Sequence, residues 1–211
     1  MNIAAIYDTE TTGLIDFKAT SEAEHQPHIV QLACALVDLE SRNFTETMDV
    51  IISPDGWKIT EEVSKIHGIT HEMAMDVGIP EKDAIEQFLS LMSDTDENIF
   101  DPPFRFRIAH NESFDARIIR IALLRYFGQE IADKFKAADS YCTMREATKI
   151  VKAAPTEKMI ASGRNHFKNP NLGECVRYFF DRGLEGAHNA MVDVRACADV
   201  YFAIKDHNGA A

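Results

Sequence analysis

The sequence predicts an α/β fold in which a mixed β-sheet is flanked by helices. It begins with three apolar or alternating segments, at residues 3–8, 28–38 and 44–52, that are typical of β-strands. After these, strand-like and helix-like segments alternate, as expected for a sheet with helices packed against it. A length of 211 residues with 45% hydrophobic content suits a single compact domain spanning residues 1–211.

The first half resolves into elements as follows. Residues 15–27 are polar and predict a loop, which is long enough to cover a site beside the first strand. In residues 44–52, alternate positions are mostly apolar, which predicts a strand with one buried face. Residues 81–92 carry an apolar stripe at helical spacing, and Pro80 stands at the start of this predicted helix.

The second half alternates between short strands and helices. We expect strands at 104–109 and 136–140 and helices at 112–127, 143–152 and 190–206. Another helix opens at Asn171, because Glu174 lies three residues further on in the spacing of a capping box.

The charge is strongly acidic overall but uneven. The net charge is −12, which argues against a protein that coats nucleic acid electrostatically. Residues 141–170, however, hold six bases against two acids. This basic block is interpreted as either a solvated surface or a local approach for a phosphate backbone.

The cysteines and the apolar segments bear on the compartment. Cys34, Cys142, Cys175 and Cys197 are scattered and form no CxxC pair, which favours a reduced, cytoplasmic protein without disulfides or a cysteine-zinc site. No apolar run approaches the roughly 20 residues of a membrane span, and the N-terminus lacks the pattern of a signal peptide. We therefore expect no membrane association.

Two acids stand one residue apart at the end of the first strand. In the stretch IAAIYDTETTGL, Asp8 and Glu10 occupy positions i and i+2, so both side chains point to the same face of the strand. Two carboxylates on one face repel each other unless a positive charge lies between them, and a divalent metal is the usual solution. The alternative is that DTETTG is a solvated turn.

Two more acids head the apolar stripes of predicted helices. Asp115 begins the stripe of residues 112–127, and Asp193 begins that of residues 190–206. An acid at a helix N-terminus is favourable for the helix dipole, so either residue alone is compatible with a structural role. Two of them, in addition to the pair on the first strand, are difficult to bury without cations.

His188 precedes Asp193 by five residues. On one continuous helix, five residues turn by about 500°, so the two side chains would diverge by about 140°. They share a site only if His188 lies on the loop before the helix, which Gly186 makes plausible. The alternative is a surface or capping histidine.

Together these residues form three motifs in order along the chain. They are YDTETTG with Asp8 and Glu10, HNESFD with His110, Asn111, Phe114 and Asp115, and HNAMVD with His188 and Asp193. The set resembles the three exonuclease motifs of the DEDDh, DnaQ-like 3′→5′ exonuclease family. IHGIT at 66–70 and NLGECVRYFF at 171–180 resemble two further family segments, so the resemblance spans nearly the whole chain. Asn189 stands where the tyrosine variant of the family has its tyrosine, which favours the histidine subclass.

The resemblance implies an RNase H-like fold with a five-stranded mixed sheet flanked by helices. It also implies a mechanism with two Mg²⁺ or Mn²⁺ ions about 3.5–4 Å apart. By this resemblance, Asp8, Glu10 and Asp193 hold the first ion, and Asp8 bridges to the second, which Asp115 supports. His188 takes the proton from the attacking water, a role that suits imidazoles near neutral pH.

The resemblance further implies a pocket for the 3′ nucleotide. Its expected substrate-binding residues are Thr11, Thr12, Gly13, Leu14, Ile66, His67, His110 and Asn111. Each of them taken singly could equally serve local packing. In the basic block, Lys158, Arg164 or Lys168 is the candidate for steering upstream phosphates.

The expected activity is that of a freestanding 3′→5′ exonuclease on single-stranded DNA that releases nucleoside 5′-monophosphates. An RNA 3′-trimming enzyme is the alternative, because the motifs do not report contact with a 2′-hydroxyl. A proofreading subunit of a DNA polymerase is a third reading, disfavoured because the chain ends soon after its last helix. A nucleic-acid-binding module without catalysis is the non-enzymatic alternative. The oligomeric state stays open.

Overall fold

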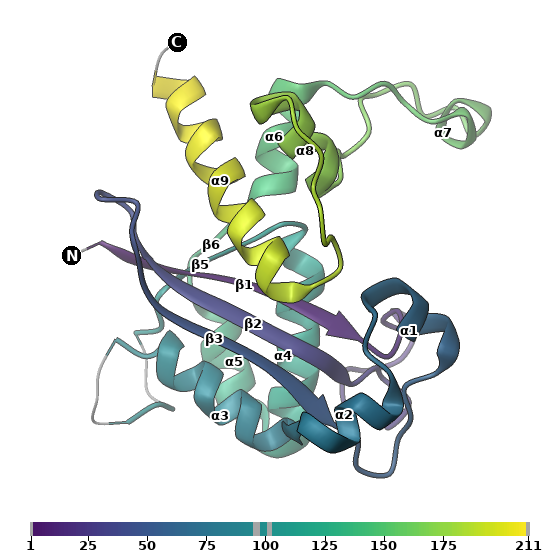
Figure 1. Ribbon diagram of the computed structural model, residues 1–211, viewed down its shortest axis with the longest axis vertical. Coiled ribbons are helices and arrows are strands. Elements are labelled where there is room, and N and C mark those ends of the chain that lie inside the picture. The colour runs from purple at the N-terminus through teal and green to yellow at the C-terminus, as the bar shows by residue number, and fades with distance from the viewer. Residues whose placement is uncertain (1, 95–97, 101–102, 210–211) are drawn as a thin grey trace.

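The computed structural model of the chain describes residues 2–94, 98–100 and 103–209. Its six strands form one mixed sheet in the order β4-β3-β2-β1-β5-β6 (Figure 1). The strands are β1 (Ile3–Thr11), β2 (Ile29–Asp38), β3 (Phe44–Ser53), β4 (Ile79–Pro80), β5 (Phe106–Ala109) and β6 (Ser140–Cys142). The pairs β1–β2 and β2–β3 are antiparallel, whereas β5 lies parallel to both β1 and β6. The expected mixed sheet is therefore confirmed.

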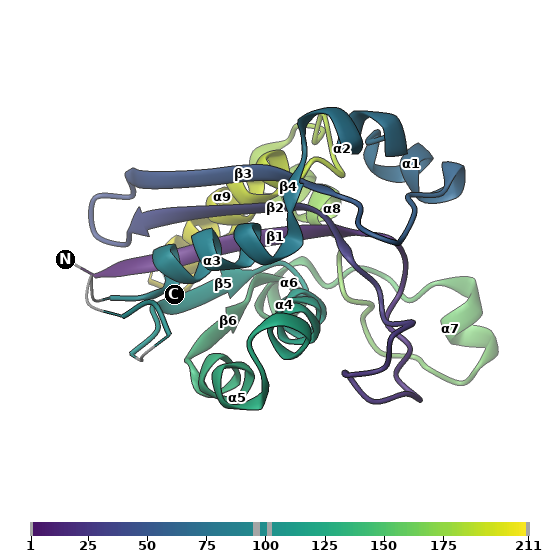
Figure 2. The ribbon, with the colours of Figure 1, turned by 90° about the horizontal axis from the view of Figure 1, so that it is seen from below.

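The helices lie on both faces of the sheet. They are α1 (Glu61–His67), α2 (His71–Val77), α3 (Glu81–Met92), α4 (Glu112–Tyr126), α5 (Gln129–Ala137), α6 (Thr143–Val151), α7 (Glu157–Ala161), α8 (Leu172–Phe180) and α9 (Ala190–Gly209). In Figure 1, α6, α8 and α9 lie above the sheet and α3, α4 and α5 below it, while α1 and α2 lie near the end of β1. Figure 2 shows the same layers from below. Among the helices of the described residues, none has the length and hydropathy needed to cross a bilayer.

Several elements differ from the sequence-based expectation. The sheet has six strands rather than five, because the two-residue β4 pairs with the end of β3 and is too short to show any alternation. The strand expected at 136–140 lies instead at Ser140–Cys142, because residues up to Ala137 belong to α5. Helices α1, α2, α5 and α7 were not predicted, and each has nine residues or fewer. The capping box at Asn171 and Glu174 is confirmed.

β1 is buried on both faces, which explains its unbroken apolar run. On one face, Tyr7 packs in a core that includes Phe88 of α3 and Phe135 of α5. On the other face, Ile6 packs in a core that includes Val194 of α9. Because β1 is central, its carboxyl end is held firmly between helices from both layers.

A buried ion-pair network fixes the start of β2. Glu81, only 4% exposed, accepts hydrogen bonds from the backbone N–H of Ile29 at 2.9 Å, from Arg125 at 2.9 Å and from the Tyr126 hydroxyl at 2.9 Å. Burial raises the pKa of the Glu81 carboxyl, but the hydrogen bond from His28 and the charge of Arg125 outweigh it, so the pKa lies below its ordinary value. The network connects α3, α4 and β2 just behind the end of β1.

The network also orients the loop that follows β1. Thr12 and His28 exchange two hydrogen bonds, from the Thr12 N–H to the His28 carbonyl and from the His28 N–H to the Thr12 hydroxyl, each at 3.0 Å. The His28 ring in turn stacks on Trp57 with 4.7 Å between ring centroids. The start of this loop is thus attached to the core rather than free.

We predict that Glu81→Ala lowers the free energy of unfolding by about 3–5 kcal/mol, because it leaves the buried Ile29 N–H without its acceptor and takes the paired carboxylate away from the partly buried Arg125. Glu86→Ala on the same helix is the control, since Glu86 makes only an exposed pair with Lys82 at 3.7 Å. Chemical denaturation measures both variants. Equal losses in the two would contradict a structural role for the network.

Candidate active site

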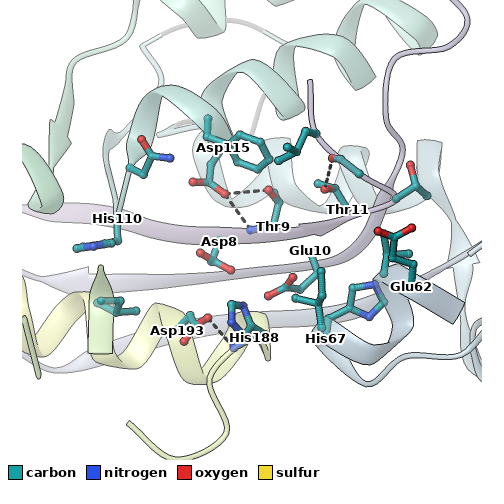
Figure 3. Close-up of a pocket in the computed structure, with 18 of the residues that line it drawn as sticks. Asp8, Thr9, Glu10, Thr11, Glu62, His67, His110, Asp115, His188 and Asp193 are labelled. Atoms are coloured by element: carbon teal, nitrogen blue, oxygen red, sulfur yellow. Dashed lines mark hydrogen bonds between the residues drawn. The ribbon is translucent and has the colours of Figure 1, made fainter. Parts of the chain in front are cut away.

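The site forms where β1 extends beyond its parallel neighbour. Ile6 pairs with Ile108 of β5, and β5 ends one residue later, at Ala109. On that side, the residues of β1 that follow therefore lie beside the turn that leads into α4, while on the other side they still pair with β2. This gap allows side chains from both helical layers to reach the end of β1 (Figure 3).

Asp115 reaches β1 from the α4 side and is held by Thr9. Its Oδ1 accepts hydrogen bonds from the Thr9 N–H at 3.1 Å and from the Thr9 hydroxyl at 2.8 Å. Thr9 can do this because it points to the opposite face from Asp8 and Glu10, as strand alternation requires. Figure 3 shows Asp8 between Asp115 and Asp193.

Asp193 reaches the site from α9, and His188 lies on the loop before this helix. Asn189 immediately precedes α9, and its side-chain oxygen accepts a hydrogen bond from the Val192 N–H at 3.2 Å. His188 adopts a left-handed conformation with φ of 67°, and its backbone N–H donates to Asp193 Oδ2 at 3.0 Å. The expected loop placement of His188 is therefore what the structure shows.

Gln31, which no sequence pattern singled out, connects the start of α9 to the sheet. It is 3% exposed and lies opposite Glu10 on β2. Its Oε1 accepts a hydrogen bond from the Ala190 N–H at 3.1 Å, and its Nε2 donates to Asp49 at 2.8 Å. Because Ala190 is the first residue of α9, Gln31 sets the position of Asp193 relative to Glu10.

The electrostatics of the site are dominated by burial and by repulsion between carboxylates. Burial, followed by the charges of Asp115, Asp193 and Glu10, raises the pKa of Asp8 well above its ordinary value. Burial, followed by the charges of Asp193 and Asp115, raises the pKa of Glu10 to about 8. Burial raises the pKa of Asp115 to about 7 even though the Thr9 hydrogen bonds lower it. The protein alone thus leaves these carboxyls poorly compensated.

The donor set fits divalent cations. Asp193 Oδ1 is buried and has no hydrogen-bond partner among the described residues. The ligand atoms of Glu10, His188 and Asp193 lie within 4.8 Å of one another. Clustered carboxylate oxygens are the ligands preferred by Mg²⁺ and Mn²⁺. A cation here would neutralise the repulsion and provide a partner for the orphaned oxygen.

These residues open into a cavity of about 840 Å³. The cavity is lined by every residue expected to be a metal ligand, the base or part of the nucleotide pocket, namely Asp8, Glu10, Thr11, Thr12, Gly13, Leu14, Ile66, His67, His110, Asn111, Asp115, His188 and Asp193. It is also lined by Thr60, Glu62 and Val63, which were not predicted because helix α1 was not recognised. The long segment 16–27 contributes no lining residue, so it does not cover the cavity.

His67 offers an unpaired donor to the cavity. Its Nδ1 accepts a hydrogen bond from the Ile69 N–H at 3.1 Å, so in the neutral ring Nε2 carries the proton. This Nε2 is buried and lacks a partner among the described residues. Burial, followed by the nearby His188, lowers the pKa of His67, which keeps the ring neutral. A hydrogen-bond acceptor on a bound ligand would provide the missing partner for the His67 Nε2–H.

His110 is engaged by the protein instead. Its Nδ1 lies 2.9 Å from the Thr143 hydroxyl and its Nε2 lies 3.1 Å from the Pro170 carbonyl. Burial lowers the pKa of His110 to about 4. His110 therefore lines the cavity but has neither ring nitrogen available to a ligand.

The fold and this site define a class of protein: a nuclease that gathers four acids at the end of a central strand of a mixed sheet. Residues 5–201 match the RNase T family, whose description is exonuclease. The chain belongs to this exonuclease family, and the predicted membership of the DEDDh, RNase H-like superfamily and the predicted class of enzyme, a 3′→5′ exonuclease, are confirmed.

Two relatives found by sequence comparison are named as subunits of a DNA polymerase. DNA polymerase III subunit epsilon of Buchnera aphidicola is 27% identical over 197 residues, which cover 93% of this chain and 70% of that protein. The subunit of the same name from Salmonella typhimurium is 24% identical over 200 residues, covering 94% of this chain and 70% of that protein.

Solved structures share the fold. Exonuclease I of E. coli in complex with a dT13 oligonucleotide is 19% identical with a TM-score of 0.70, over 97% of this chain. Exonuclease I from Methylocaldum szegediense is 20% identical with a TM-score of 0.64, over 98% of this chain. This chain spans 41% of the length of each, so it corresponds to less than half of those proteins.

The raised pKa values predict a pH-dependent stability of the metal-free protein. Glu10 and Asp115 bind protons more tightly folded than unfolded, so their contribution to stability is lost as the pH rises from about 4 through about 8. Each titrating group costs up to about 1.4 kcal/mol per pH unit in that window. Because Mg²⁺ favours the ionised carboxylates, millimolar Mg²⁺ should raise the melting temperature by several degrees more at about pH 8 than at about pH 5.

Asp115→Asn is the matched control for this measurement, because it removes one charge with little change of shape and should weaken the pH dependence. A shift of equal size at both pH values, or no shift with Mg²⁺ or Mn²⁺, would count against the cation site.

We predict that Gln31→Leu weakens Mn²⁺ binding by about tenfold, because second-layer partners of metal ligands typically contribute that much or more. The variant leaves the Ala190 N–H without its acceptor and loosens the start of α9. Titration calorimetry measures the affinity, with Gln87→Leu, an exposed position on α3, as the control. An affinity equal to that of the control would show that Gln31 does not position Asp193.

Proposed function

We propose that this chain is a divalent-metal-dependent 3′→5′ exonuclease that removes nucleotides from the 3′ end of single-stranded DNA and releases nucleoside 5′-monophosphates. The observation that carries the proposal is the convergence of Asp8, Glu10, Asp115 and Asp193 with His188 in one cavity. Family membership supports the reaction class.

The four acids would hold two Mg²⁺ or Mn²⁺ ions, with Asp8, Glu10 and Asp193 on one and Asp8 and Asp115 on the other. Such ions, when bound, stabilise developing charge on the phosphate and activate water. The chain itself orients the ligands: Thr9 fixes Asp115, and the His188 backbone fixes Asp193. This arrangement leaves the His188 side chain exposed at the cavity, where it can accept the proton of the attacking water.

The 3′ nucleotide would lie against the loop after β1 and helix α1. Gly13 lets the backbone of the segment Thr11–Leu14 approach it closely, since open space lies where a Cβ would be. Leu14 and Ile66 are 88% and 55% exposed and offer apolar contact to a base or sugar. The His67 Nε2–H supplies a hydrogen-bond donor. Asn111, just before α4, also lines the cavity.

DNA is favoured over RNA because the curated relatives are named as subunits of a DNA polymerase. The same names favour a second candidate function, a proofreading subunit that works with a polymerase. An RNA 3′-trimming activity differs chiefly in tolerance of a 2′-hydroxyl and is an outcome of the same assay.

We further propose that the chain is a single exonuclease domain that works in the cytoplasm. All four cysteines are free and buried, as expected in a reducing compartment such as the cytoplasm. The family match from residue 5 to residue 201 supports a single exonuclease domain.

We predict that His188→Asn lowers kcat by about 10²–10⁴-fold, the usual contribution of a general base, while Mn²⁺ affinity changes little. Asparagine tolerates the left-handed backbone of this position, and the variant keeps the N–H that holds Asp193. Loss of Mn²⁺ binding would instead make His188 a ligand. Near-normal kcat would remove its role as base.

The function is tested with 5′-labelled single-stranded DNA and RNA of one sequence, each incubated with Mg²⁺, with Mn²⁺ and with EDTA. The proposal predicts a metal-dependent ladder that shortens from the 3′ end, faster on DNA, and its loss in Asp8→Ala. Intact oligonucleotides in every lane with folded protein would favour a binding module or a polymerase-dependent subunit. A substantial rate in Asp8→Ala would place the chemistry elsewhere.

A further inference from the structure

Residues 152–168, between α6 and α8, form a projecting arm. None of residues 154–167, all of which the structure describes, is buried. The Lys168 N–H donates to the Ala153 carbonyl at 3.1 Å and closes the arm at its base. Figures 1 and 2 show α7, which lies in the arm, beyond the end of the sheet at which β1 ends. The fold therefore holds the base and leaves the sides of the arm in solvent.

The base of the arm is attached to the wall of the active-site cavity. His110 joins Thr143, the first residue of α6, to the carbonyl of Pro170 just after the arm. Leu172, two residues further on, lines the cavity. A strand that leaves the cavity on this side consequently meets the arm.

The arm is positively charged on an acidic protein. It carries four basic residues against one acid, a net charge of +3, whereas the whole chain has a net charge of −12. Lys168 is neutralised by Glu174 at 2.6 Å, so it belongs to the base of the arm rather than to a binding surface. Lys152, Lys158 and Arg164 make no ion pair with any residue that the structure describes. Their charge is left for an external anion.

Apolar side chains accompany these charges. Phe167 and Ile160 are 49% and 54% exposed. Cationic side chains that follow a phosphate backbone, together with an aromatic ring on which bases stack, are the features that bind single strands without sequence preference. An acidic peptide would use the charges but gain less from the exposed ring.

We propose that this arm binds the single-stranded nucleic acid upstream of the 3′ end, with Lys158 and Arg164 on the phosphates and Phe167 stacked on a base. The proposal rests on the proposed function, because it assigns the upstream strand of that same site. It follows that the arm raises the affinity for long strands and does not change the affinity for strands too short to reach it.

The test measures binding by fluorescence anisotropy of labelled oligothymidylates of roughly 20 and 3 nucleotides. EDTA is present so that metal-dependent hydrolysis does not degrade the strands. For Lys158→Gln/Arg164→Gln we expect the Kd for the long strand to rise about tenfold and its salt dependence to become shallower by about 1.4, or about 0.7 per lost phosphate contact. Phe167→Ala should raise the same Kd by about fivefold or more without changing the salt dependence. The short strand should bind all variants equally.

Lys82→Gln/Lys136→Gln is the matched control, because it removes the same charge from exposed positions on α3 and α5. If the arm variant binds the long strand like the control, or if the protein itself does not bind it, the arm proposal is overturned. An equal loss for both strand lengths would also overturn it, because the arm would then act on the cavity.

Hydrolysis of the p-nitrophenyl ester of thymidine 5′-monophosphate with Mn²⁺ separates this proposal from the proposed function. The ester is too small to reach the arm, so arm variants should hydrolyse it at the wild-type rate. Absence of ester and DNA hydrolysis by the wild type contradicts the proposed function, while the binding data still decide the role of the arm.

Discussion

Four carboxylates gathered at the end of β1 repel one another, and the rest of the structure has to hold them together against this repulsion. A folded chain brings Asp8, Glu10, Asp115 and Asp193 together only at a cost, which appears as pKa values raised by burial and by neighbouring charge. Buried charges that persist in a native fold are paired or bind metal. The surrounding architecture therefore holds these groups where a divalent cation would compensate their charge.

The two helical layers hold the acids in different ways. On one side, Thr9 donates two hydrogen bonds to Asp115 of α4, which hold that carboxylate at the edge of β1. On the other side, Gln31 anchors the first residue of α9, and the left-handed His188 holds Asp193. The central position of β1 between two apolar cores makes this placement rigid. Rigid placement of ligands is what a metal-dependent reaction needs, because misplaced groups lose much of their effect.

The sequence predicted what depends on local pattern. The strands of the first half and the helices that carry Asp115 and Asp193 follow from apolar periodicity, and strand alternation alone placed Asp8 and Glu10 together. The loop position of His188 followed from helix geometry. Helices α1 and α2 were missed because they are short and hold few buried residues, and Glu62 was missed with them. Gln31 could not be found, because its role exists only when β2 lies beside β1 and α9 begins above it.

The central claim is that these carboxyls are held protonated or metal-bound by their proximity. Carbon-13 NMR of the side-chain carboxyls in metal-free protein measures this directly as a function of pH. We expect Glu10 to titrate at a pKa of about 8 and Asp115 at a pKa of about 7, and Mg²⁺ to lower both values. Titration of every site carboxyl below about pH 5 without metal, the ordinary range for such groups, would contradict it.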